Sequence, residues 1–203
     1  MFVIETKVES GERGEDRVAI ERLEDRLVVV VADGAGGTGS GAEAAETVCK
    51  RICEAARQGT RGAEAWQLML RELDLLVASG SGGQSTATVV EIDADNVCGA
   101  SVGDTEAWLV RARDAVDLTT DQERKPLLGS GEARPAAFGP INSGGRLLVA
   151  TDGLFGYSTH AAIEATVRDG SLSTALDRLA ASVVLRSGAY PDDLAMVLGE
   201  WAG

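Results

Sequence analysis

Three aspartates are the residues best suited to chemistry, and two of them share a local sequence pattern. Asp33 and Asp152 each follow a short apolar run and precede a glycine, in Val-Val-Val-Val-Ala-Asp-Gly and Leu-Leu-Val-Ala-Thr-Asp-Gly. Asp192 comes shortly before a further apolar run, and Glu15-Asp16 precedes a candidate strand. Because short apolar runs predict buried strands, each acidic side chain would be held at a strand end.

Carboxylates that converge in this way suit hard divalent cations. Mg²⁺ and Mn²⁺ prefer oxygen ligands and retain several water molecules. Two such ions ~4 Å apart can lower the pKa of a shared water molecule and clamp a phosphoryl group during an in-line displacement. An Asp-Gly pair is also ordinary turn chemistry. The recurrence of acidic residues at several strand ends is what favours a metal site.

The overall composition is that of an acidic globular protein. Hydrophobic residues make up 44% and charged residues 25% of the 203-residue chain, close to the globular average. The net charge of −13 repels phosphate backbones and anionic surfaces, so we expect neither a nucleic-acid nor a membrane partner. The N-terminus lacks a signal-peptide pattern, and no apolar run reaches the ~20 residues of a membrane helix. We therefore expect a cytoplasmic protein.

The three cysteines are expected to be buried thiols rather than metal ligands. Cys49 and Cys53 are four residues apart in a helical pattern, and Cys98 lies in an apolar run. No further pair of Cys or His residues completes a zinc site. Small apolar thiols are common in protein cores, and free thiols suit a reducing compartment.

The order of the predicted elements indicates an α+β fold. Strands are predicted at 2–8, 16–21, 27–32, 85–92, 97–102, 107–111, 115–118, 147–150 and 194–201. Helices are predicted at 41–57, 66–77, 161–167 and 172–185. Helix pairs beside runs of strands favour layers over alternating βαβ units. Residues 120–145 hold three of the four prolines and five glycines, and we expect a long irregular segment there.

The ordered set of motifs resembles the type 2C, or PPM, metal-dependent protein phosphatases. Ala32-Asp33-Gly34-Ala35-Gly36-Gly37 is similar to the family's Asp-Gly-x-Gly-Gly signature, and Ala150-Thr151-Asp152-Gly153-Leu154 resembles its Ser-Asp-Gly motif. Shorter matches follow the family's order, at Glu15-Asp16, Ser85-Thr86-Ala87, Val102-Gly103-Asp104-Thr105, Thr119-Thr120-Asp121, Leu128-Gly129 and Asp192-Asp193-Leu194. Each motif is short, but together they cover nearly the whole chain.

This resemblance implies a fold and an activity. The fold would be a four-layer α-β-β-α sandwich, in which residues 1–203 form a single domain of two packed antiparallel sheets flanked by helix pairs. The activity would be hydrolysis of phosphoserine and phosphothreonine by a bridging metal-bound hydroxide. Two Mg²⁺ or Mn²⁺ ions, with a third weaker ion, would be the cofactors. The partners would be a phosphorylated protein substrate and a cognate serine/threonine kinase.

The resemblance also implies roles for individual residues. Asp33 would bridge two ions, and the Gly34 carbonyl would bind one of them. Asp152 and Asp192 would complete the shell of the other ion. The remaining residues implied to contact metal or metal-bound water are Glu15 and Asp16, with Asp104 at the third ion.

The implied mechanism needs no side-chain nucleophile. Ser85 and Thr86 are the hydroxyl residues that sequence alone would suggest for such a role. The one histidine, His160, has no recognisable partner motif, which disfavours a Ser-His-Asp triad.

Three departures from the family pattern concern the substrate. Gly11 stands where the family often has a phosphate-binding arginine, and the nearby Arg13 is our candidate for contact with the substrate phosphate. Glu106 follows the Gly-Asp-Thr motif where an arginine is usual, and a shortened flap is expected at about 120–145. The missing arginine and the shortened flap leave open a catalytically weak or inactive phosphatase-fold protein that acts as a partner-binding regulatory module. A second alternative is an unrelated acidic α+β domain in which the motifs match by chance.

Overall fold

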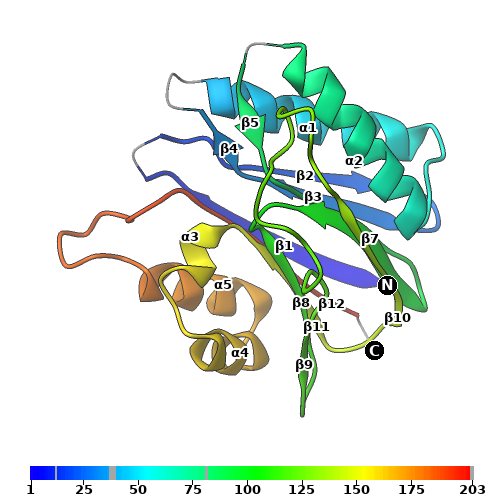
Figure 1. The fold of residues 1–203 in the computed structure, drawn as a ribbon. Coiled ribbons are helices and arrows are strands. Elements are labelled where there is room, and N and C mark those ends of the chain that lie inside the picture. The colour runs from blue at the N-terminus through cyan, green and yellow to red at the C-terminus, as the bar shows by residue number, and fades with distance from the viewer. Residues whose placement is uncertain (12, 37–39, 81, 202–203) are drawn as a thin grey trace.

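Two five-stranded antiparallel sheets are the centre of the computed structural model, which describes residues 1–11, 13–36, 40–80 and 82–201 (Figure 1). The first sheet has the order β1 (Phe2–Glu9), β12 (Leu194–Trp201), β11 (Arg146–Ala150), β8 (Glu106–Val110) and β9 (Ala115–Asp117). The second has the order β10 (Ala136–Asn142), β7 (Asn96–Val102), β6 (Ala87–Ile92), β3 (Leu27–Ala32) and β2 (Arg17–Arg22). A separate two-residue pair joins β4 (Gly34–Ala35) to β5 (Gln84–Ser85).

Helices cover the outer face of each sheet. On the second sheet lie α1 (Ser40–Arg57) and α2 (Ala63–Ala78). On the first lie α3 (Asp152–Phe155), α4 (His160–Arg168) and α5 (Leu172–Ser182). The expected α-β-β-α sandwich is thereby confirmed, and an unrelated fold is excluded. Among the described helices, none combines the length and the apolarity that crossing a bilayer requires.

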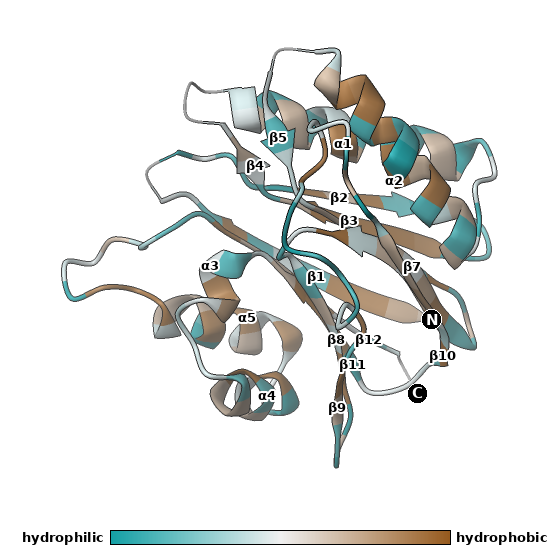
Figure 2. Cartoon of the chain, in the orientation of Figure 1, coloured by the Kyte–Doolittle hydropathy of each residue, from teal (hydrophilic) through white to brown (hydrophobic). Residues whose placement is uncertain are grey.

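Strand β3 shows why an unbroken apolar run suits this architecture. All six of its residues are buried. Val28 and Val30 face the core under α1 and α2, whereas Val29 and Val31 face the core between the sheets. Successive side chains of a strand point to opposite faces, so a strand buried on both sides must be apolar at every position. Figure 2 shows this concentration of apolar residues in the inner strands.

The helices bury the faces that the sequence predicts. Trp66, Leu70 and Leu73 of α2 are almost fully buried against the second sheet. Leu176 and Leu179 of α5 are buried on the first sheet in the same way. These residues recur three or four positions apart, which places them on one side of a helix. Among the cysteines, Cys49 and Cys53 are buried in α1, and Cys98 is half-buried.

The structure corrects several predicted boundaries. Residues 136–142 form β10 rather than irregular chain, because an edge strand tolerates Pro140 and a register shift between Phe138 and Ile141 accommodates it. The strand predicted at 85–92 is divided at Thr86. The last helix ends at Ser182, and the single turn of α3 was not predicted.

Candidate metal centre

Three aspartates converge at one end of the two sheets. Asp33 follows β3, Asp104 lies in the turn between β7 and β8, and Asp152 is the first residue of α3 after β11. One carboxylate oxygen from each lies within 4.8 Å of the other two. Both sheets therefore contribute acidic residues to one point, as the strand-end pattern of Asp33 and Asp152 predicts.

Asp16 adds a fourth carboxylate beside this group. Its side chain is buried, and Thr151 Oγ1 donates a hydrogen bond to Asp16 Oδ2 over 2.7 Å. The same Thr151 hydroxyl accepts a hydrogen bond from Ala195 N at 3.0 Å, which fixes its orientation. Asp16 Oδ1 is buried and receives no hydrogen bond within the part of the chain that the structure describes. A buried carboxylate oxygen without a donor favours a cation beside it.

Burial, and then the charges of neighbouring carboxylates, raise the pKa values of the acidic side chains at this centre. Burial raises the pKa of Asp33 to about 9, and the carboxylates of Asp16 and Asp152 add to the rise. Burial likewise raises the pKa of Asp16 to about 7. For Asp152, burial and then the charge of Asp104 raise the pKa to about 6. Together these carboxylates need positive charge before they can all ionise at neutral pH.

These shifts predict that the metal-free protein loses stability as the pH rises. The pKa values of Asp33, Asp16 and Asp152 are raised above the ordinary 3.8 in the folded state. The folded state therefore binds more protons than the unfolded one. The stabilisation that these protons give the folded state is complete below pH ~4. It is lost as the pH rises through the folded-state pKa values, up to about 9 for Asp33.

Divalent ions replace these protons, so the increase in Tm on adding Mn²⁺ should be larger at pH 8.5 than at pH 5. Thermal unfolding followed by circular dichroism, with chelator and with Mn²⁺ at both pH values, measures the difference. The Asp33→Asn variant should show a smaller dependence on pH. An equal increase in Tm on adding Mn²⁺ at both pH values contradicts the prediction.

Buried hydroxyl groups hold the backbone of Asp33. Thr86 N donates to the Asp33 carbonyl at 2.8 Å, and Asp33 N donates to Thr86 Oγ1 at 2.9 Å. Ser85 Oγ donates to the same Asp33 carbonyl at 3.1 Å. Both side chains are buried, so they position Asp33 and are inaccessible as nucleophiles. Gly34 is required next to it, because a Cβ atom there would lie 2.3 Å from the Gly41 carbonyl oxygen.

The two acids of the terminal motif have different surroundings. Asp193 is buried and accepts hydrogen bonds from Gly11 N at 2.7 Å and from Glu15 N at 2.6 Å. Asp192 is exposed, and its charge contributes to the raised pKa of Asp152, after burial and the charge of Asp104. Since Asp193 is committed to the backbone, Asp192 is the residue of this pair that is available to a metal ion. It lies outside the 4.8 Å group.

The structure explains the missing arginine at position 11. A Cβ atom on Gly11 would lie 2.6 Å from the Asp192 carbonyl carbon and 2.8 Å from its oxygen. No side chain fits there with this backbone. Arg13, the candidate that sequence suggests instead, has a side chain 67% exposed and lies 4.0 Å from Glu15. Its contact with a substrate phosphate stays a prediction.

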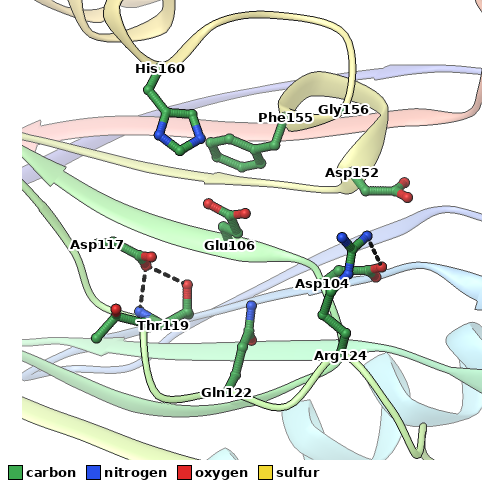
Figure 3. A pocket seen from close by; sticks show the side chains of 11 residues that line it. Asp104, Glu106, Asp117, Thr119, Gln122, Arg124, Asp152, Phe155, Gly156 and His160 are labelled. Carbon is green, nitrogen blue, oxygen red and sulfur yellow. Dashed lines mark hydrogen bonds and ion pairs between the residues drawn. The ribbon is translucent and has the colours of Figure 1, made fainter.

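Arg124 is the residue that sequence reasoning missed. Its Nη2 donates to Asp104 Oδ2 at 2.9 Å, and 76% of its side chain is exposed. Figure 3 shows its guanidinium beside Asp104, with Asp152 near both side chains. Arg124 belongs to the long segment 120–145, whose weak periodicity gave no position for its side chains. A basic residue in a long loop was the only available signal.

A family comparison decides the assignment. The model described as Stage II sporulation protein E (SpoIIE) matches residues 24–202. The chain belongs to the SpoIIE family. The bacterial serine/threonine phosphatases described next share its fold, as the resemblance of its motifs to the PPM family predicts.

Solved structures share the fold of this SpoIIE-family chain. The S. agalactiae serine/threonine phosphatase has a TM-score of 0.85 at 17% identity, with 100% of each chain covered. The Mycobacterium tuberculosis phosphatase PstP/Ppp has a TM-score of 0.83 at 16% identity, with 100% of this chain and 99% of that one covered. The catalytic domain of PstP in complex with two manganese ions has a TM-score of 0.81 at 17% identity, covering 98% and 97%. No protein of curated function matches the sequence.

Proposed function

We propose that this protein is a Mg²⁺- or Mn²⁺-dependent phosphatase that acts on phosphoserine and phosphothreonine in a protein substrate. It would act in the cytoplasm and oppose a cognate kinase. The observation that carries the proposal is the convergence of Asp33, Asp104 and Asp152 within 4.8 Å. The donor-free oxygen of Asp16 beside them supports it.

The residues at the centre fit hard divalent cations. Asp33 with the Gly34 carbonyl, and Asp152 with Asp192, would hold two ions. Glu15, Asp16 and Asp104 would hold their water molecules or a third ion. Carboxylate and carbonyl oxygens are the ligands that Mg²⁺ and Mn²⁺ prefer. When bound, such a pair supplies a hydroxide nucleophile at neutral pH and charge stabilisation for the phosphoryl oxygens.

The chain's own contribution is to position these acids and to orient the phosphate. Thr86 and Thr151 hold Asp33 and Asp16 through hydrogen bonds of 2.9 and 2.7 Å. Arg124 lies beside Asp104 and presents a planar set of donors that suits phosphate oxygens. We assign it to substrate binding, on the shortened flap at 120–145. In this role Arg124 would replace the phosphate-binding arginine for which the backbone at position 11 leaves no room.

Arg124→Ala should lower kcat/KM for phosphate esters on the order of tenfold, the usual loss for a charge-assisted hydrogen bond. We expect the loss mainly in KM when Mn²⁺ is saturating, so that any change in metal affinity from losing the hydrogen bond to Asp104 does not limit the reaction. Arg124→Lys should restore only part of it. Arg134→Ala is the matched control, since Arg134 belongs to the same segment and is 72% exposed. Steady-state kinetics with p-nitrophenyl phosphate tests this, and equal losses in both alanine variants contradict it.

The proposed function is tested by phosphate release from p-nitrophenyl phosphate and from a phosphothreonine peptide. Release should require Mn²⁺ or Mg²⁺ and should stop in excess chelator. Calorimetric titration should show at least two bound Mn²⁺ ions. A protein that binds no metal and releases no phosphate would instead be the partner-binding regulatory module.

A further inference from the structure

A cavity of about 380 Å³ lies beside the candidate metal centre (Figure 3). Asp104, Arg124 and Asp152 line it, and the same three residues line a second cavity of about 580 Å³. The metal centre is therefore the junction of two cavities. A phosphorylated residue held at this junction would direct the neighbouring residues of its chain into them.

The part of the first cavity away from the metal centre is also acidic. Glu106 begins β8 and lies two positions before Trp108, so the two side chains share one face of the strand. Asp117 of the adjacent strand β9 is paired with Trp108. Both carboxylates therefore lie on the outer face of the first sheet. Trp108 Nε1 donates to Glu106 Oε2 at 2.9 Å. Thr119 donates twice to Asp117 Oδ1, from N at 2.8 Å and from Oγ1 at 2.7 Å. Each carboxylate is thus fixed through one oxygen and keeps the other for a ligand.

Aromatic side chains form the wall opposite these acids. Phe155 and His160 line the cavity, and both rings contact Trp108, with centroid distances of 5.1 and 4.7 Å. Figure 3 shows Phe155 and His160 on one side of Glu106, with Asp117 on the other. An aromatic face next to carboxylates suits a long cationic side chain, whose stem packs on the ring while its head meets the acids.

We propose that the cavity of Glu106, Asp117 and Phe155 binds a lysine or arginine side chain adjacent to the phosphorylated residue of the protein substrate. This inference rests on the proposed function and adds a substrate class to it. Asp104 and Asp152 are committed to metal ions and Arg124 to the phosphate, so Glu106 and Asp117 are the charges left to face the substrate. Both are negatively charged, which favours a basic residue next to the phosphorylated residue.

Peptide binding measures this selection without requiring turnover. Fluorescent peptides with a non-hydrolysable phosphonate in place of phosphoserine carry lysine, alanine or glutamate on both sides of it. Fluorescence anisotropy with Mn²⁺ gives Kd for the wild type, Glu106→Gln, Asp117→Asn, the double variant and Glu106→Arg. Asp121→Asn is the matched control, because it removes the same charge from an exposed position outside the cavity.

For the wild type, we expect the lysine peptide to bind about tenfold more tightly than the glutamate peptide, with the difference shrinking at high salt. The ratio of Kd for the glutamate peptide to Kd for the lysine peptide should fall in each single variant and approach one in the double variant. In Glu106→Arg it should fall below one. It should persist in Asp121→Asn. A ratio near one in the wild type, or an unchanged ratio in the double variant, overturns the inference. The amide variants keep the shape of the acids, so the test does not depend on Glu106→Arg folding.

Failure of the proposed function is seen separately. A peptide with hydrolysable phosphoserine between alanine residues tests the enzyme assignment. Phosphate release from it by the wild type depends on the metal centre and not on the charges of the Glu106 cavity. If release is absent while the Kd ratio is present, the enzyme assignment is wrong and the basic-residue selectivity stands. If release is present while the ratio is near one, the selectivity is wrong and the enzyme assignment stands.

Discussion

Asp33→Asn should lower metal-dependent phosphate release by at least ~100-fold, because the loss of even an outer partner of a metal ligand commonly costs 10–100-fold. Asp33 contributes to the 4.8 Å group and is one of the residues that would hold the two ions. An amide removes the negative charge while keeping nearly the same shape. Release of p-nitrophenol with saturating Mn²⁺ measures activity, and calorimetry measures the accompanying loss of Mn²⁺ affinity.

Stability distinguishes this effect from misfolding. Burial and the neighbouring carboxylates raise the pKa of Asp33 to about 9, so at pH 8.5 its ionised form is unfavourable in the folded protein. The metal-free Asp33→Asn variant should therefore be at least as stable as the wild type at this pH. Asp25→Asn, an exposed change of the same kind, serves as the control for activity. Full activity in Asp33→Asn, or wild-type activity in excess chelator, would falsify the mechanism.

Asp193→Ala should lower the free energy of unfolding by about 3 kcal/mol, the usual scale for two hydrogen bonds to a buried charged group. The substitution leaves the amide groups of Gly11 and Glu15 without their acceptor. Asp192→Ala should cost little stability, because Asp192 is exposed, but should weaken Mn²⁺ binding. The two neighbouring aspartates thus separate folding from metal binding.

Urea denaturation of the two metal-free variants gives the difference in stability, and calorimetric titration gives their Mn²⁺ affinities. The prediction requires opposite rankings, with Asp193→Ala less stable and Asp192→Ala weaker in metal binding when both are folded. If Asp192→Ala is the less stable variant, the roles assigned to the pair are reversed.

Local patterns were sufficient to predict part of the fold and part of the site. The valine-rich run before Asp33 predicts a strand buried on both faces, and β3 has this property at all six positions. Asp152 follows the same rule after β11. The pattern is informative because the pleat of a strand and the turn after it are set by residues adjacent in sequence.

Contacts between distant segments could not be predicted in this way. Thr151 orients Asp16 across 135 positions, and Asp193 accepts from Glu15 N across 178. A threonine or an aspartate carries no local sign of such a partner. Arg124 lies in a segment without periodicity, so its place beside Asp104 depends on how the loop packs. Pro140 argued against a strand, but the edge position of β10 tolerates it.

The position of β12 has a consequence for the order in which the fold assembles. This strand is the last in the described chain, yet it lies between β1 and β11 within its sheet. Until β12 inserts, β1 has no neighbour in that sheet, and Asp193 cannot accept its hydrogen bonds from Gly11 N and Glu15 N. Closing such long loops costs entropy that later contacts must offset. The acids that precede β12, Asp192 and Asp193, therefore take their places at the metal centre only once β12 pairs with β1 and β11.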